Sequence, residues 1–184
     1  MLFVGIGVGT AHAQFFGFSV DTAVDYTVAP DKVTGGTVGI IHPIGFIPNF
    51  GYTQIKFVNE VDVSSNVQLN SEVILNSYNV FFNIPFPVVA VSLGAGIGEA
   101  KVESSLTGYA NKPSVSKPLV EGFTRVGLPF WNFIEFHLGI HAIKVSSKID
   151  AGKSWSSIES GVDSVDTEKD YTGTLTTVGL QFAF

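Results

Sequence analysis

The chain has no cysteine, few charged residues and no long hydrophobic run, and each shortage excludes a class of protein. Without cysteine, disulfide, iron–sulfur and thiolate chemistry are impossible. Charged residues make up only 14% of the sequence, although hydrophobic residues reach 45%. No stretch approaches the roughly 20 apolar residues that a membrane-spanning helix needs. An oily composition without such a helix is typical of a transmembrane β-barrel, in which lipid-facing residues alternate with lumen-facing ones.

Positive charge is also scarce, because 10 Lys and Arg stand against 16 Asp and Glu and the net charge is −6. This balance argues against nucleic acid as a partner. The first residues carry no positive charge either, but they are small and apolar and end in Ala11-His12-Ala13, the pattern of a secretory cleavage site. We therefore predict a signal-peptide remnant at 1–13 and a β-barrel at 14–184. The alternative is that these residues extend the first strand.

Alternation with a period of two predicts β-strands from the start of the barrel onward. Along residues 16–28, six apolar side chains, including Tyr26, share one face. Both carboxylates of this stretch, Asp21 and Asp25, fall on the other face. We expect the apolar face to meet lipid and the carboxylates to face the lumen.

Three short segments rich in proline and aromatic residues are predicted as periplasmic turns, at 45–50, 84–88 and 128–133. Proline ends strand pairing, and aromatic side chains suit the membrane–water interface. The expected interfacial aromatics are Phe46, Phe50, Phe86, Phe130, Trp131 and Phe133. The longer polar segments near 29–36, 61–71, 104–117 and 150–170 are predicted to be outer loops.

Eight strands with three tight turns, four longer loops and periplasmic termini make up the minimal plan of a bacterial barrel. The sequence therefore predicts an all-β fold, an eight-stranded antiparallel transmembrane β-barrel with up-and-down meander topology. Such a protein is integral to the bacterial outer membrane. We expect its last strand to pair with its first.

The final stretch, residues 171–184, alternates with a period of two from Thr174 on and ends on an aromatic residue. It resembles the closing strand of bacterial outer-membrane β-barrels, whose terminal Phe is read by the barrel-assembly machinery. The resemblance implies that Phe182 and Phe184 form an assembly signal. It also implies that the barrel-assembly machinery is a partner during biogenesis.

Charged and imidazole side chains on inward strand positions predict a polar network in the lumen. Its expected members are Asp21, Asp25, Lys56, Glu121, Arg125, Glu135, His137 and His141. Isolated charges in a low-dielectric interior are costly, so we expect Arg125 to pair with Glu135 or Glu121. A structural plug is favoured over a proton- or ion-responsive gate. An eight-stranded barrel holds little more than its own side chains, which disfavours an open pore.

No catalytic, cofactor or metal site is predicted. The glycines of 94–98 alternate along a strand with no helix after them, so they do not form a phosphate-binding loop. They are expected to leave room for large side chains opposite. His137 and His141 lie roughly 13 Å apart along one strand, too far to share a metal. The acidic loop at 150–170 lacks the spacing of an EF-hand and is interpreted as solvated rather than as a divalent-cation site.

The segment 41–53, IHPIGFIPNFGYT, carries a family resemblance. It resembles the turn of a family of small, mostly uncharacterised Gram-negative outer-membrane β-barrel proteins, in which His-Pro is followed by Pro-Asn and a strand with Tyr-Thr. Strands 77–84 and 89–98 are also similar. The resemblance covers roughly residues 15–184 in plan and implies the same fold and location. That family defines no functional residue, so none is implied here.

These observations favour a non-enzymatic barrel with a filled lumen. It would act in membrane integrity or in surface interaction through its outer loops, surrounded by outer-membrane lipid and lipopolysaccharide. The first alternative is a conduit for small hydrophobic molecules. That function needs an apolar cavity open to a gap in the wall, which an inward row containing Asp21, Arg125 and Glu135 disfavours. The second alternative is an outer-membrane lipid-modifying enzyme, although no outer loop contains a His for surface catalysis.

Overall fold

A computed structural model shows the chain as a closed antiparallel barrel. The structure describes residues 16–29, 31–42, 44, 47–64, 66–86, 88–131, 133–155, 162 and 165–183. The predicted signal remnant at 1–13, Phe46 and Phe184 lie outside the described residues. None of the described residues belongs to a helix long and apolar enough to cross a membrane.

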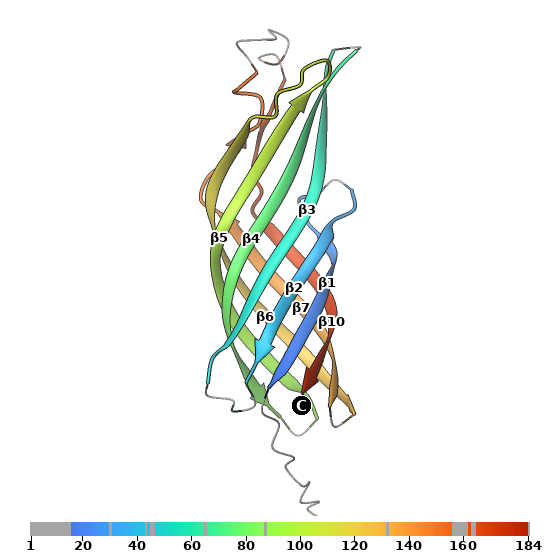
Figure 1. The fold of residues 1–184 in the computed structure, drawn as a ribbon, viewed down its shortest axis with the longest axis vertical. Coiled ribbons are helices and arrows are strands. Elements are labelled where there is room, and N and C mark those ends of the chain that lie inside the picture. The colour runs from blue at the N-terminus through green and yellow to red at the C-terminus, as the bar shows by residue number, and fades with distance from the viewer. Residues whose placement is uncertain are drawn as a thin grey trace, which may run out of the picture.

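Eight strands close the barrel in the order β1-β10-β7-β6-β5-β4-β3-β2 (Figure 1). They are β1 (Gly17–Tyr26), β2 (Thr34–Ile41), β3 (Asn49–Ser64), β4 (Val67–Pro85), β5 (Ala90–Leu106), β6 (Ser114–Trp131), β7 (Ile134–Val145) and β10 (Gly173–Ala183). The last strand pairs with the first, with Phe18 opposite Phe182. The predicted eight-stranded meander is therefore confirmed.

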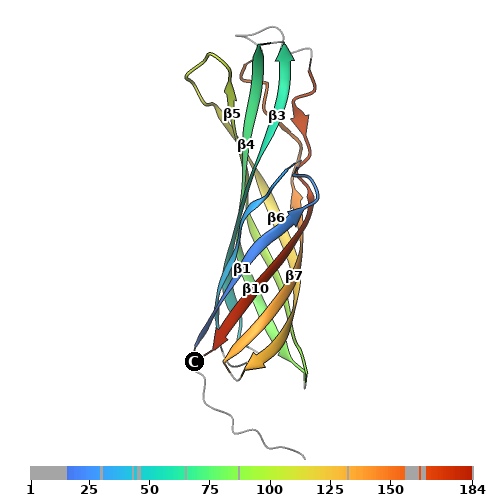
Figure 2. The same cartoon turned by 90° about the vertical axis from the view of Figure 1, so that its right-hand side faces the viewer.

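Several strands continue well past the level where β1 and β2 end, and Figures 1 and 2 show β3, β4 and β5 rising above the barrel. The predicted outer loops at 61–71 and 104–117 were too long, because β3 runs to Ser64 and β4 begins at Val67. Only residues 107–113 separate β5 from β6. These segments form strands because their inward apolar side chains, such as Leu69 and Leu106, belong to an apolar cluster.

The last outer loop is folded over the inside of this extension. It contains a separate two-stranded ribbon of β8 (Ile149–Asp150) and β9 (Glu168–Lys169). The Asp150 carboxylate accepts hydrogen bonds from the backbone of Gly152 and Lys153 and from the hydroxyl of Thr167. Trp155 is buried among apolar side chains and donates its indole N–H to the Ser104 hydroxyl at 2.9 Å. The apolar side chains in the described part of this loop are therefore packed as a cover, whereas its acidic side chains Asp166, Glu168 and Asp170 are exposed, as expected for a solvated acidic loop.

The interior of the barrel is layered, as the inward residues of β4 show. We call the end with the short connections the short-turn end, and the opposite end the long-loop end. From the short-turn end, β4 places Phe81 inward, then Asn79 and Ser77, then Leu75 and Val73, and all are buried. Phe81 belongs to a small apolar cluster, whereas Leu75 and Val73 belong to the largest one. A polar layer thus lies between two apolar layers inside the barrel.

Inward glycines make room for the large side chains of this interior, as the sequence predicted. A Cβ built on Gly94 would lie 2.4 Å from Phe123 Cζ and 2.6 Å from Phe81 Cβ. Such contacts are far shorter than van der Waals separation, so the aromatic pair fits only because position 94 has no side chain.

We expect Gly94→Leu to lower the free energy of unfolding in detergent by about 1–3 kcal/mol, the usual cost of overpacking a filled interior. Gly122→Leu is the matched control, because a Cβ at Gly122 would meet no atom within 4 Å. Urea or guanidinium titration of the two folded variants measures the difference. Equal stability of the two variants would show that the lumen is not closely packed at Gly94.

Candidate functional site

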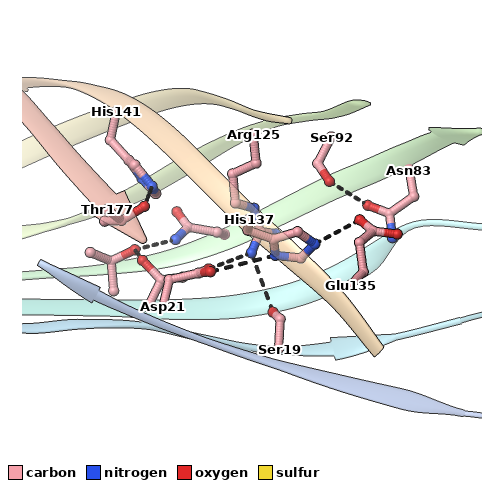
Figure 3. Close-up of polar contacts among 12 residues, drawn as sticks. Ser19, Asp21, Asn83, Ser92, Arg125, Glu135, His137, His141 and Thr177 are labelled. Carbon is pink, nitrogen blue, oxygen red and sulfur yellow. Dashed lines mark hydrogen bonds and ion pairs between the residues drawn. The ribbon is translucent and has the colours of Figure 1, made fainter. Parts of the chain in front are cut away.

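The polar layer begins with a chain of charged groups centred on Asp21 of β1 (Figure 3). Arg125 of β6 donates from Nη1 to Asp21 Oδ2 at 2.7 Å and to Ser19 Oγ at 3.2 Å. His137 of β7 places Nδ1 3.5 Å from Asp21 Oδ1 and Nε2 2.8 Å from Glu135 Oε1. Arg125, Asp21 and His137 are at most 2% exposed, whereas the Glu135 side chain is 16% exposed. This series of contacts therefore runs from the partly exposed carboxylate of Glu135 to the fully buried guanidinium of Arg125.

Aromatic rings hold the same guanidinium from other directions. Arg125 Cζ lies 4.4 Å from the centroid of the Phe81 ring and 5.1 Å from that of Phe123. Cation–π contacts of desolvated groups contribute up to about 2 kcal/mol. Arg125 is thus stabilised by one buried carboxylate and two ring faces together.

A second cluster surrounds Glu121 of β6. His141 of β7 places Nδ1 2.5 Å from Glu121 Oε1, and Thr53 of β3 donates to the same oxygen at 3.2 Å. Ser77 of β4 donates to the other carboxylate oxygen. Because β3 and β7 are far apart in the barrel order, Glu121 ties opposite walls of the barrel together.

The contacts of His141 also bear on catalysis. Its Nε2 lies 3.3 Å from Thr177 Oγ1, so Thr177, His141 and Glu121 line up as hydroxyl, imidazole and carboxylate. Such an order is used in nucleophilic catalysis. Here Thr177 and His141 are 0% exposed, and Phe123 stacks on the imidazole at 4.8 Å between centroids. The hydroxyl and the imidazole are therefore both closed to solvent.

Metal binding has no support in the polar layer. Among the described residues, no three His, Cys, Asp or Glu side chains are grouped closely enough to hold a metal ion. The acidic groups instead contact basic side chains: Asp21 contacts Arg125 and His137, Glu135 contacts His137, and Glu121 contacts His141.

Most of the predicted lumen residues lie in this layer, but two do not. The structure places inside the barrel Asp21, Glu121, Arg125, Glu135, His137 and His141. It does not bring Asp25 or Lys56 into the lumen.

Asp25 is exposed because β1 contains a bulge. Ala23 pairs with Thr177 and Asp25 pairs with Thr176, so Val24 is an extra residue on β1. One extra residue reverses the faces of every residue that follows. Tyr26, predicted to face lipid, is therefore buried and donates its hydroxyl to the backbone oxygen of Tyr171.

Lys56 lies on the outward face of β3, because the inward positions hold Thr53, Ile55 and Phe57, which are all buried. The prediction that Lys56 faces the lumen was therefore wrong. The interior near the long-loop end is apolar, so Ile55 and Phe57 point inward and the polar Gln54 and Lys56 point outward.

The partner of Arg125 also differs from the prediction. Glu135 contacts His137, and Glu121 contacts His141, whereas Arg125 reaches Asp21. Strands β6 and β1 are not neighbours in the barrel order, so this ion pair crosses the lumen. Neighbouring strand positions alone do not indicate such a pair.

The sequence analysis missed the largest interior feature, which we call the apolar stopper. It fills the lumen between the polar layer and the long-loop end. The buried side chains that form it are Tyr26, Val33, Ile55, Phe57, Val73, Leu75, Ala100, Val102, Leu119, Ile143, Val145, Ile149, Ala151, Tyr171 and Leu175. A signal was present where a strand is apolar on both faces, as at residues 73–75 (Val-Ile-Leu).

The predicted interfacial aromatics that the structure describes all point outward. Phe50, Phe86, Phe130, Trp131 and Phe133 are each more than half exposed. Phe130, Trp131 and Phe133 contact one another at the β6–β7 connection. In the turn that carries the His-Pro motif, Asn49 Oδ1 accepts a hydrogen bond from the backbone of His42 at 2.5 Å, which ties the two ends of the turn together.

No protein-family model and no curated protein sequence matches the chain. Solved structures do match. A major outer membrane protein from Thermus thermophilus has a TM-score of 0.59 at 12% identity and covers 92% of this chain and 99% of its own. The N-terminal β-barrel domain of Pseudomonas aeruginosa OprF has a TM-score of 0.54 at 9% identity, and the match covers 92% of this chain and 96% of that domain. Neisserial surface protein A has a TM-score of 0.53 at 12% identity, and the match covers 92% of this chain and 94% of that protein. The chain therefore has the fold of small outer-membrane β-barrel proteins.

Proposed function

We propose that the chain is an integral outer-membrane protein that neither conducts nor catalyses, and that acts in membrane integrity or surface interaction through its long-loop end. The observation that carries this proposal is the filled interior. The polar layer and the apolar stopper occupy successive levels of the lumen, and their side chains are buried against one another. A barrel of eight strands has little interior volume beyond its side chains.

The exterior supports the membrane location. Most of the exposed large hydrophobic residues lie on the outward positions of the barrel strands, as in Phe136, Leu138 and Ile140 of β7. Above this band the extension of β3 to β6 presents charged side chains such as Glu60, Asp62 and Glu72. An apolar band below a polar extension is the pattern expected of a barrel that spans a bilayer and projects from it.

The partners follow from this location. Outer-membrane lipid and lipopolysaccharide would surround the apolar band, and the barrel-assembly machinery would insert the chain. The extension would carry any contact with a surface partner. Nucleic acid is not proposed as a partner, because the net charge is −6.

In planar bilayers we expect the folded protein to give no large steady conductance, because the buried side chains of the apolar stopper occupy the lumen. Insertion is verified separately by heat-modifiable gel mobility and by fractionation with the outer membrane. A porin-like steady conductance would reject the filled-lumen proposal and favour the conduit. Recovery of the folded protein from another cell fraction would reject the location.

A further inference from the structure

A groove of about 350 Å³ runs along β2 on the outside of the barrel. Phe18 of β1 lines one side, and Phe50 and Tyr52 of β3 line the other. Between them β2 contributes the shorter Val38 and Ile40, which pair with these neighbours in two rows. The groove exists because the outward side chains of β2 are shorter than the aromatic side chains of the strands on either side.

Polar side chains lie at the end of this groove nearer the long loops. Tyr52, which lines the groove, donates its hydroxyl to Asn76 Oδ1 at 3.0 Å. Gln54 Nε2 donates to the Tyr52 hydroxyl at 3.1 Å and to Asn76 Oδ1 at 2.9 Å. All three side chains are on the outward face, because they alternate with the buried Thr53 and Ser77. Amides facing hydrocarbon are costly, so this cluster marks the depth where headgroups begin.

Lys56 follows Gln54 on the same face of β3. Within the described part of the chain it forms no ion pair, whereas Lys101 two strands away is paired with Glu103 at 2.5 Å. The outward carboxylates on Glu72, Glu99 and Glu103 belong to β4 and β5, across β3 from the groove. Those of β3 itself, on Glu60 and Asp62, follow Lys56 on the side away from the groove. The ammonium group of Lys56 is therefore the charge closest along β3 to the polar end of the groove.

The outward side chains of β3 thus change in one direction from apolar to cationic, in the order Phe50, Tyr52, Gln54 and Lys56. This row spans roughly 20 Å along the strand. A lipid with a phosphorylated headgroup presents the same order, with an acyl chain, then ester or sugar oxygens, then a negative charge. The wall beside β2 matches such a molecule in both shape and charge.

We propose that this groove is a binding site for one outer-leaflet lipid that carries a phosphate group. Its acyl chain lies along β2 between Phe18 and Phe50, its ester or sugar oxygens meet Gln54 and Asn76, and its phosphate meets Lys56. The proposal rests on the outer-membrane location proposed above.

Native mass spectrometry of the full chain in neutral detergent tests this site, with anionic phosphatidylglycerol as the probe. The competitor is phosphatidylcholine, whose phosphate is neutralised by its own quaternary ammonium group. We expect the folded protein to retain one phosphatidylglycerol molecule in preference to phosphatidylcholine. Val38→Trp fills the groove, and Lys56→Gln removes the charge. Each change should weaken retention roughly tenfold, as expected for the loss of a well-formed contact.

Two control variants make the same kinds of substitution at positions outside the groove. Val126→Trp adds the same ring at an exposed position of β6, and Lys144→Gln removes an exposed lysine of β7. Neither should alter retention of phosphatidylglycerol. Equal losses in the control and groove variants would overturn the site, as would a loss with Val38→Trp alone, since that result leaves no role for the phosphate. Heat-modifiable mobility and outer-membrane fractionation of each variant distinguish failure of this site from failure of the proposed location.

Discussion

Arg125→Leu is expected to lower the free energy of unfolding in detergent by about 3–5 kcal/mol, the usual loss when one partner of a buried ion pair is removed. Asp21, with its side chain fully buried, would lose its guanidinium partner and keep only the His137 imidazole of its two partners. The guanidinium contacts with Phe81 and Phe123 would disappear as well. Denaturant titration followed by heat-modifiable mobility measures the loss.

Two comparisons make this prediction specific to the ion pair. Lys112→Leu removes a cation at an exposed position in the β5–β6 connection and should change stability by less than about 1 kcal/mol. The double variant Asp21→Asn with Arg125→Leu should recover part of the loss, because it no longer leaves a buried carboxylate unpaired. Additive losses in the double variant would show that Arg125 acts through its ring contacts rather than through Asp21.

The strands could be predicted from the sequence because side-chain alternation is a local property. On β7, His137 and His141 alternate with Leu138 and Ile140, and the structure buries the former and exposes the latter. The same reasoning failed after Val24, where one extra residue reversed Asp25 and Tyr26. A bulge leaves no reliable mark in the sequence, since its position depends on the partner strand.

The site was harder to predict because its contacts cross the barrel. The pairing of Arg125 with Asp21 joins strands 104 residues apart in sequence, and the rotation of each strand around the barrel decides which side chains meet. On β3 the error had another cause. Lys56 was predicted to face inward because it is charged, yet the stopper makes the interior apolar toward the long-loop end and leaves Lys56 outside. Polarity identifies the two faces of a strand, but only the layer opposite decides which face is inner.

Trp155→Ala is expected to open the cover formed by the last outer loop while the barrel stays folded. The indole is 1% exposed and packs with Leu69, Leu106 and Val162. Truncating a buried Trp typically costs about 3–5 kcal/mol. Because the stopper and the polar layer do not contain this residue, we expect the loss to appear as local opening rather than global unfolding.

Limited trypsin digestion measures that opening at Lys153, which lies two residues before the indole and is exposed. When opening is fast relative to cleavage, the rate follows the open population, so about 3–5 kcal/mol corresponds to a cleavage rate raised by roughly 10²–10³-fold or more. The chain contains two Trp residues, and Trp131→Ala is the matched control because that indole is 60% exposed. Cleavage at Lys153 should be unchanged in the control, and both variants should keep the heat-modifiable mobility of the folded barrel. If Trp155→Ala instead unfolds the whole barrel, the cover and the barrel form one cooperative unit. The extension of β3 to β6 would then unfold together with the barrel rather than independently of it.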